Sequence, residues 1–367
     1  MDLLQAVPDP RHRRGVRHPV RTVVALAVCA AVAGARSFTA IAQWAQGLSA
    51  EALRRLGATR RTPPSEPTIR RVLQSVDADR LDAQLGPWLL RVAAPHGARL
   101  SVDGKTVRGG HARGAAAPHL LSAILHQDAV VVAQAAVPPT TNEIPMLPRL
   151  LAPLPLAGAV VTADALHTQT ETARFLVEEK QADYVFTVKE NQATLKQDIA
   201  ALRLDAFPPQ ATTTEKGHGR LETRRLWTST ALNTYLAFPH VGQVFCLQRQ
   251  VEELATGAHR RETVYGVTSL PPAQAAPAHL LALIRAHWTI ENRLHWVRDV
   301  TFDEDRSQIR RGAGPQVMAT LRNLAISLLR LAGAPLIAPA LRHAGWAGQA
   351  LIFRLLGIDL RAAGPGL

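Results

Sequence analysis

The chain has 367 residues, with 42 Lys and Arg against 29 Asp and Glu, which gives a formal net charge of +13. This length allows two or three domains, or one large domain with an insertion, so core size is not limiting. The charge favours nucleic acid as a partner before an anionic membrane surface, although a protein that is merely basic has the same balance. Cys29 and Cys246 follow no CxxC spacing, which argues against a disulfide framework and fits a reducing cytoplasm.

The first 95 residues predict a helical N-terminal domain for DNA binding or positioning. An apolar run at 23–35 follows a basic start, as in a secretory leader, but its continuation with helical spacing favours a buried helix. The run is 13 residues long, too short to span a bilayer, and we expect no membrane partner. A later helix should start near Ser65–Pro67. Its Arg70 and Arg71 either face DNA phosphates or form a solvated basic face.

From Ala98 the pattern predicts the first part of an α/β domain, at 96–204. Three strands come first, the last two joined as a hairpin, followed by alternating helices and strands. The strands are expected at 99–107, 120–125, 130–137, 159–163 and 183–189, and the helices at 142–154 and 168–181. Three antiparallel strands followed by alternating helix and strand indicate a mixed sheet with helices.

Residues 205–272 show a different residue pattern, which predicts a β-rich insertion with one basic, solvent-exposed face. Three runs of alternating polar and apolar residues are expected to be its strands. The second part of the α/β domain follows at 273–332, with a helical run at 287–305 and a helix at 315–331. The tail at 333–367 is rich in Ala, Pro and Leu, and we assign it no role.

Three acidic residues are candidates for one metal site. Asp103 and Asp164 each end a strand-like run, where an open sheet presents residues to a ligand crevice. Glu291 lies on a side of its helix that we expect not to be fully solvated. Hard oxygen ligands select Mg²⁺ or Mn²⁺, and two such ions about 3.5 to 4 Å apart can activate a water or a 3′ hydroxyl.

Each acid also has a simpler explanation. Asp103 precedes a glycine and Asp164 precedes a helix, so either could be a turn or cap residue. Glu291 could form an ion pair with one of its basic neighbours, namely Arg293, His295 or Arg298. The acids that follow on the same run are less favoured alternatives as metal ligands, namely Asp299, Asp303, Glu304 and Asp305.

Other kinds of site fail on spacing. Gly104, Lys105 and Thr106 resemble the end of a phosphate-binding loop, but Arg99 stands where that loop needs glycine. His287, Glu291 and His295 could bind zinc, yet the HExxH order is absent and Trp288 and Trp296 are expected to crowd the turn. A Ser-His-Asp hydrolase would need a GxSxG elbow, which the sequence lacks.

Motifs along most of the chain resemble those of the bacterial DDE-type insertion-sequence transposases, specifically the H-repeat-associated group. They are PDPRHRRGVRHPV, AGARSFTAIAQWA, PSEPTIRRVL, VDGKTVRG, TADALHTQ, YVFTVKENQ, GHGRLETR, HWTIENRLHWVRDVTFDED and RNLAISLLR, in this order. The resemblance implies an RNase H-like catalytic fold with Asp103, Asp164 and Glu291 as the acids. It also implies a β insertion before the glutamate, and Mg²⁺-dependent strand cleavage and transfer.

The sequence departs from the wider superfamily on the glutamate helix. That superfamily has tyrosine seven residues before the glutamate, arginine four before and lysine seven after, where this chain has Ile284, His287 and Arg298. Only Arg298 keeps a cation there. Lys189, Asn191 and Gln192 match the KENQ segment, which could contact DNA or form a simple turn. The expected DNA contacts are Lys105, Arg108, Lys189, Asn191, His287, Arg298, Arg70 and Arg71.

The sequence therefore predicts a cytoplasmic DNA transposase that uses two Mg²⁺ or Mn²⁺ ions, as in the two-metal mechanism. Its partners would be double-stranded DNA, as terminal inverted repeats and as target, with a homodimer in the active complex. One alternative is a catalytically inactive, transposase-derived DNA-binding protein that acts as a repressor or architectural factor. Another is a metal-dependent nuclease without strand transfer.

Overall fold

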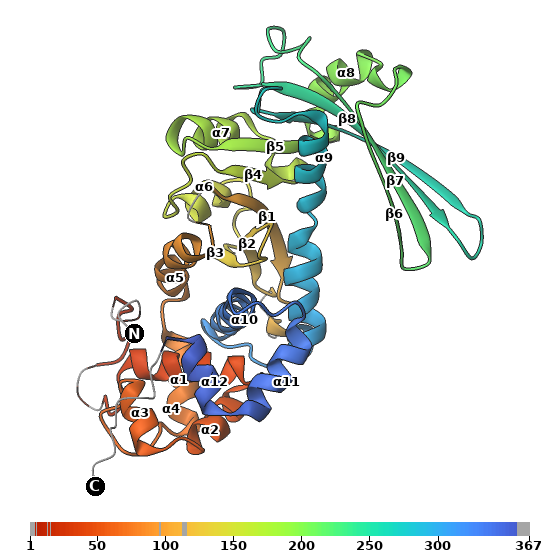
Figure 1. Cartoon of the computed structure of the whole chain (residues 1–367). Coiled ribbons are helices and arrows are strands. Elements are labelled where there is room, and N and C mark those ends of the chain that lie inside the picture. Colours follow the sequence, from red (N-terminus) through yellow and green to blue (C-terminus); the bar gives the residue numbers. More distant parts are fainter. Residues whose placement is uncertain are drawn as a thin grey trace. The chain divides into compact units, whose positions relative to one another are not determined.

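A computed structural model gives the arrangement of the chain (Figure 1). It describes residues 4, 6–12, 14, 16–94, 97–111 and 116–357. The chain divides into two compact units. Unit 1 comprises Met1–Pro95, Gly104–Asn142 and Thr289–Leu367, and unit 2 comprises His96–Asp103 and Glu143–Trp288. Within the described residues, no helix is long and apolar enough to cross a membrane.

Unit 1 is mainly helical. Its helices are α1 (Val20–Val32), α2 (Phe38–Gln46), α3 (Ala50–Arg55), α4 (Glu66–Ser75), α5 (Ala78–Ala93), α10 (Gly314–Leu331), α11 (Ile337–Ala347) and α12 (Gln349–Leu355). The side chains of Ser37, Ser49 and Asp77 accept backbone N–H groups at the starts of α2, α3 and α5, which satisfies donors that a helix leaves free. The N-terminal helices thus confirm the predicted helical character of this region.

Helices α1 and α10 form the centre of unit 1. All residues of α1 but Arg21 are buried, and α1 packs against α10, α2 and α4. This burial supports the buried-helix interpretation of the apolar run at 23–35. Helices α11 and α12 also contact α1, so the described part of the predicted tail packs against the N-terminal helices. Residues 358–367 of that tail lie outside the described residues.

Unit 2 is built from strands with fewer helices. Its strands are β1 (Arg99–Thr106, whose last three residues belong to unit 1), β4 (Val160–Ala163), β5 (Asp183–Val188), β6 (Ala211–Gly217), β7 (Arg220–Ser229), β8 (Gln243–Glu253) and β9 (His259–Thr268). Its helices are α6 (Met146–Leu151), α7 (Thr170–Arg174), α8 (Ala193–Ala201) and α9 (Pro277–Ala286). Apolar side chains of β7 and β8, such as Leu226 and Phe245, pack with Leu280 and Ile284 of α9 to form a core.

The sheet order confirms the predicted mixed α/β fold. With β2 (His119–Leu125) and β3 (Val131–Val137) included, the strands follow the order β3-β2-β1-β4-β5-β9-β8-β7-β6. Strand β4 is parallel to both β1 and β5, whereas β2 and β3 form an antiparallel hairpin as predicted. The order β3-β2-β1-β4-β5 with a parallel β1-β4-β5 centre is that of an RNase H-like sheet.

The predicted β insertion differs from the structure in two respects. It contains four strands instead of three, because the first run folds back between β6 and β7 at His218 and Gly219, which have φ values of 53° and 73°. In addition, β9 pairs antiparallel with β5, with Val185 opposite Thr268. The segment therefore extends the sheet and does not interrupt it. Periodicity identifies strands, but it cannot show which neighbour completes their hydrogen bonds.

The predicted helices at 142–154 and 287–305 are shorter or less regular than expected. Helix α6 covers only Met146–Leu151 of the first. The second has two π-helical turns, Glu291–His295 and Val297–Thr301, before Asp303 takes a left-handed conformation with φ 55°. A non-glycine residue in that region ends regular helix, so the helical run stops near Thr301.

Candidate active site

Strand register places two of the predicted acids at the same level of unit 2. Strands β1 and β4 are parallel, and Val102 is opposite Ala163. Asp103 directly follows Val102, and Asp164 directly follows Ala163. The two aspartates therefore lie at equivalent positions along the sheet. Asp164 comes directly after β4, as predicted, whereas Asp103 lies within β1, which continues to Thr106. Both aspartates are half-buried.

The carboxylate of Asp164 is held by the turn that follows it. Its Oδ1 accepts a hydrogen bond from the backbone N–H of Leu166 at 3.0 Å, which caps the 3₁₀ turn Ala165–His167. The cap role that the sequence left open for Asp164 is therefore present. A carboxylate oriented by its own backbone loses little further conformational freedom when it binds a ligand.

Side chains of the KENQ segment, residues 189–192, hold the turn that follows Asp164. Asn191 Nδ2 donates to the carbonyl of Ala165 at 2.6 Å, and Gln192 Nε2 donates to the carbonyl of Thr168 at 2.9 Å. The amide of Asn191 is thus engaged within unit 2, although the residue is exposed. Lys189 is exposed as well, and its DNA contact stays a prediction. The KENQ pattern predicts DNA contacts or a turn, but the support that these amides lend to the turn after Asp164 is visible only in the fold.

His287 lies beside β4, and its burial favours the neutral imidazole. Its Nδ1 and the Thr162 hydroxyl are 3.1 Å apart. Burial lowers the pKa of His287 to about 4, although the negative charge of Asp164 acts in the opposite direction. At neutral pH the imidazole therefore carries no positive charge. A neutral imidazole does not attract a phosphate by charge, so electrostatics does not favour the predicted contact between His287 and DNA.

Glu291 begins a π-helical turn of unit 1 and is more exposed than the sequence suggested. Its side chain is 56% exposed, and its Oε2 lies 3.4 Å from Nδ1 of the buried His295. This hydrogen bond, together with the charges of His295 and Lys105, lowers the pKa of Glu291 despite some burial. Trp288 and Trp296 are both more than half exposed and do not crowd the turn. Among the basic neighbours considered for Glu291, the observed partner is His295.

Two of the predicted acids belong to a group of side chains that could hold a metal ion. Asp103 is the last residue of its segment of unit 2, and its peptide bond joins it to Gly104 of unit 1. Asp103, Glu291 and His295 each offer a ligand atom, and these atoms lie within 4.8 Å of one another. Asp164 is not a member of this group. The sequence considered His295 only as an ion-pair partner or as part of a zinc set.

The prediction that Arg298 contacts a phosphate is wrong. Its side chain is 0% exposed and forms an ion pair with the equally buried Glu304 at 2.8 Å. Arg322 of α10 also pairs with Glu304 at 2.8 Å. Burial opposes ionisation of Glu304, but the two guanidinium groups hold its pKa below the usual value. Arg298 is therefore part of the core of unit 1, and its partner is Glu304 instead of Glu291.

The remaining predicted DNA contacts of unit 1 are partly engaged. Lys105 pairs with Asp299 at 2.6 Å and its side chain is 9% exposed, so a phosphate would have to displace that aspartate. Arg108 is 79% exposed and lies 3.8 Å from Asp305.

Arg70 and Arg71 are exposed on α4. Arg70 pairs with Glu66 at 2.6 Å, and Arg71 donates to the carbonyl of Pro67 at 3.1 Å. Exposed ion pairs of this type contribute little to stability and exchange readily, so both arginines remain predicted phosphate contacts.

The mixed sheet has RNase H-like order, and two of its adjacent parallel strands carry carboxylates at equivalent positions. This is the arrangement that the sequence predicts for a DDE-type transposase. The chain belongs to the transposase DDE-domain family. The family described as "Transposase DDE domain" matches residues 95–328, and the one described as "DDE_Tnp_1-associated" matches residues 1–89. The predicted family is thereby confirmed.

Individual relatives agree with this family. The chain is 30% identical over 350 residues to "Putative transposase YncI" of Escherichia coli O157:H7, covering 90% of this chain and 87% of that protein. It is 25% identical over 344 residues to "H repeat-associated putative transposase YhhI" of Escherichia coli strain K12, covering 90% and 89%. A solved piggyBac transposase synaptic complex with hairpin DNA is similar at 12% identity and a TM-score of 0.42, covering 100% of this chain and 78% of that chain.

Proposed function

We propose that this transposase-family chain hydrolyses DNA at the ends of a mobile element and joins the freed 3′ hydroxyl to target DNA. The observation that carries the proposal is the register of Val102 opposite Ala163, because it brings Asp103 and Asp164 to the same level of two parallel strands. Glu291 is the third acid of the proposed site. Double-stranded DNA, as terminal inverted repeats and as target, is the proposed partner, with a homodimer as the active complex in the cytoplasm.

The donor set fits a hard divalent cation. Carboxylate oxygens are the ligands that Mg²⁺ and Mn²⁺ prefer, and among the described residues the metal-binding group contains no cysteine. Asp103, Asp164 and Glu291 would hold the metal, as one or two ions. When bound, Mg²⁺ would neutralise phosphate charge and make a water or 3′ hydroxyl a better nucleophile.

The chain's own residues would prepare these carboxylates. The Leu166 N–H fixes one oxygen of Asp164, and the KENQ amides hold the turn that carries this donor. The hydrogen bond to His295 favours the ionised form of Glu291 and restrains its side chain. His287 remains neutral beside Asp164, so it does not compete with a cation by forming an ion pair. The exposed Arg108 and Lys189 are proposed to contact phosphates.

Replacing a proposed ligand by its amide tests the site. Asp103→Asn and Glu291→Gln keep the side-chain volume but remove the charge that a divalent cation needs. We expect each variant to lose Mg²⁺-dependent cleavage of element-end DNA, measured on denaturing gels, while its affinity for the same DNA stays largely unchanged. Glu171→Gln is the control, since that side chain is 80% exposed and lies on α7.

Full cleavage by either Asp103→Asn or Glu291→Gln would contradict the proposal. The wild-type products separate the alternatives. Cleavage without joined products would indicate a nuclease that lacks strand transfer. DNA binding with neither cleavage nor joining, in Mg²⁺ and in Mn²⁺, would indicate an inactive, transposase-derived repressor or architectural protein.

A further inference from the structure

Strands β6 to β9 form a ribbon (Figure 1). Its two faces differ in how their charged side chains are paired. One face, here the packed face, carries Leu226, Phe245 and Leu247 and packs against α9. Further along the strands it carries Arg224 and Arg249. These arginines are paired with glutamates of the same face: Arg224 with Glu222 at 2.8 Å, and Arg249 with Glu222 and, at 3.9 Å, with Glu262. Arg224 and Arg249 of the packed face are therefore neutralised by acids of the same face.

The opposite face, here the open face, carries a row of polar side chains across all four strands. Thr214 of β6 is opposite Thr223 of β7, which is opposite Gln250 of β8, which is opposite Arg261 of β9. The hydroxyls of Thr214 and Thr223 are 3.2 Å apart. Thr214 and Arg261 are exposed, and the row contains no carboxylate.

A second row lies two residues nearer the centre of the sheet. It consists of Thr212, Arg225, Gln248 and Thr263, again one residue from each strand. Arg225 Nη1 donates to Gln250 Oε1 of the first row at 3.2 Å, which links the two rows. Gln248 is buried, whereas Thr212 and Thr263 are exposed. This row also lacks an acid.

The arginines of the open face have no counterion. In the described parts of the chain, no ion pair joins Arg225 or Arg261 to a carboxylate. Glu252 is the strand acid in the next row outward, where Lys216 on β6 also lies. Asp205, outside the strands, is the other acid whose charge acts near Cys246 on this face. The open face thus presents more cations than acids, in contrast to the packed face.

We propose that the open face binds the phosphate backbone of double-stranded DNA. The inference rests on the proposed function, since it gives the transposase a second DNA contact away from the acids. Guanidinium, hydroxyl and amide groups are the side-chain groups that position proteins on phosphates. Rows about 7 Å apart on strands about 4.8 Å apart give a flat array of such donors. An interface with a second copy would instead bury apolar and aromatic side chains, which these rows lack.

A double variant tests the open face in the full chain. Arg225→Ala with Arg261→Ala should weaken binding to a fluorescent mixed-sequence duplex about tenfold or more, since it removes two charge-assisted contacts. The slope of log affinity against log salt should become shallower by about 0.9 for each lost phosphate contact. Arg225→Lys with Arg261→Lys keeps both charges and should retain most of the wild-type slope.

Arg260→Ala is the matched control. Arg260 is the exposed neighbour of Arg261 on β9, but it is opposite Val251 and so lies on the packed face. Its removal should leave affinity and slope unchanged. Circular dichroism and the thermal midpoint of every variant verify that the ribbon is folded.

Three results would overturn the inference. The first is a wild-type salt slope in the folded double Ala variant, and the second is an equal loss in Arg260→Ala. The third is a change in the sedimentation of the protein alone without a change in DNA binding, because the face would then join copies of the chain. Cleavage of element ends by wild-type protein tests the proposed function separately. If the wild type cleaves element ends and the double Ala variant keeps the wild-type salt slope, only the open-face proposal is refuted. If the slope changes but the wild type does not cleave, only the catalytic proposal is refuted.

Discussion

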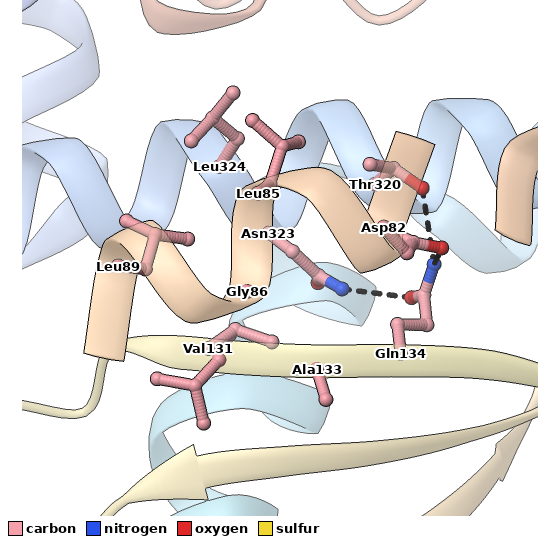
Figure 2. Close-up of a pocket in the computed structure, with 11 residues that line it drawn as sticks. Asp82, Leu85, Gly86, Leu89, Val131, Ala133, Gln134, Thr320, Asn323 and Leu324 are labelled. Carbon is pink, nitrogen blue, oxygen red and sulfur yellow. Dashed lines mark hydrogen bonds between the residues drawn. The ribbon is translucent and has the colours of Figure 1, made fainter. Parts of the chain in front are cut away.

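Asp82 is a buried carboxylate that lines a pocket of unit 1 (Figure 2). It lies on α5 and faces Gln134 of β3 and Thr320 of α10, and Gln134 Nε2 donates to Asp82 Oδ2 at 3.2 Å. Burial raises the pKa of Asp82 to about 7, although hydrogen bonds from Thr320, Gln134 and Gln316 act in the opposite direction. The charge of the exposed Asp79 raises the pKa further.

The buried Asp82 should make unit 1 less stable as the pH rises. Its folded pKa of about 7 exceeds the ordinary 3.8, so the folded chain binds this proton more tightly than the unfolded chain. The resulting stability is fully present below about pH 4 and is lost as the pH rises through about 7. Between pH 5 and pH 8 the loss amounts to about 3 kcal/mol. Asp82→Asn cannot titrate, so its free energy of unfolding should lack this fall.

Urea unfolding of wild type, Asp82→Asn and the exposed-acid control Asp128→Asn at pH 5 and pH 8 measures the difference. The control should follow the wild type. Equal pH dependence in wild type and Asp82→Asn would show that Asp82 does not remain protonated in the fold.

Single residues of the candidate site could be predicted only where sequence order fixes their surroundings. The apolar strand-like runs before Asp103 and Asp164 predict that both lie at the ends of strands, and the register of β1 and β4 places them at equivalent positions. Arg298 was misassigned, since helical spacing places it near Glu291 but does not reveal Glu304 or the approach of Arg322 from α10. A buried charge needs partners from distant elements, and one sequence does not show which elements meet.

At the scale of elements, the pairing of β9 with both β5 and β8 depends on Gly266. It is opposite Phe245 on β8 and opposite Thr187 on β5. A Cβ at this buried position would lie 2.5 Å from the carbonyl oxygen of Phe186 and would also meet the ring of Phe245. The backbone oxygen cannot move away without disturbing the sheet.

Gly266→Ala should therefore destabilise the sheet by about 1–3 kcal/mol or more, as overpacking of a rigid core does. Gly217→Ala is the matched control, because Gly217 also lies in a strand of this ribbon, at the end of β6, but has open space where a Cβ would lie. Thermal unfolding of both variants checks the expectation. A Gly266→Ala midpoint equal to that of Gly217→Ala would show that the strands shift without cost.

The strands themselves were predictable, but their connections were not. Alternation of polar and apolar residues located most strand boundaries within one or two residues. The two-residue turn at His218 and Gly219 was missed, so two strands were counted as one. The pairing of β5 with β9 joins residues about 80 positions apart, and local periodicity carries no information on such contacts.

Over the whole molecule the net charge is positive, whereas the candidate site concentrates negative charge. The net charge of +13 favours association with polyanions, whereas the site requires carboxylates close to one another. Asp103 and Glu291 each offer a ligand atom to one group within 4.8 Å, and a cation bound there would offset the negative charge of both. The order of the motifs predicted this group of acids in part, but the inclusion of His295 required the fold.

Divalent metal should therefore stabilise the whole chain through these carboxylates. If free Mg²⁺ is about ten times its dissociation constant, binding to the folded state contributes about 1.4 kcal/mol. The thermal midpoint of wild type should then rise by about 2–4 °C relative to EDTA. Asp103→Asn should lose this shift, because it removes a charged oxygen ligand that the cation needs. Glu171→Gln should keep the shift, and NaCl of matched ionic strength separates specific binding from screening. An equal shift in wild type and Asp103→Asn would place the metal elsewhere.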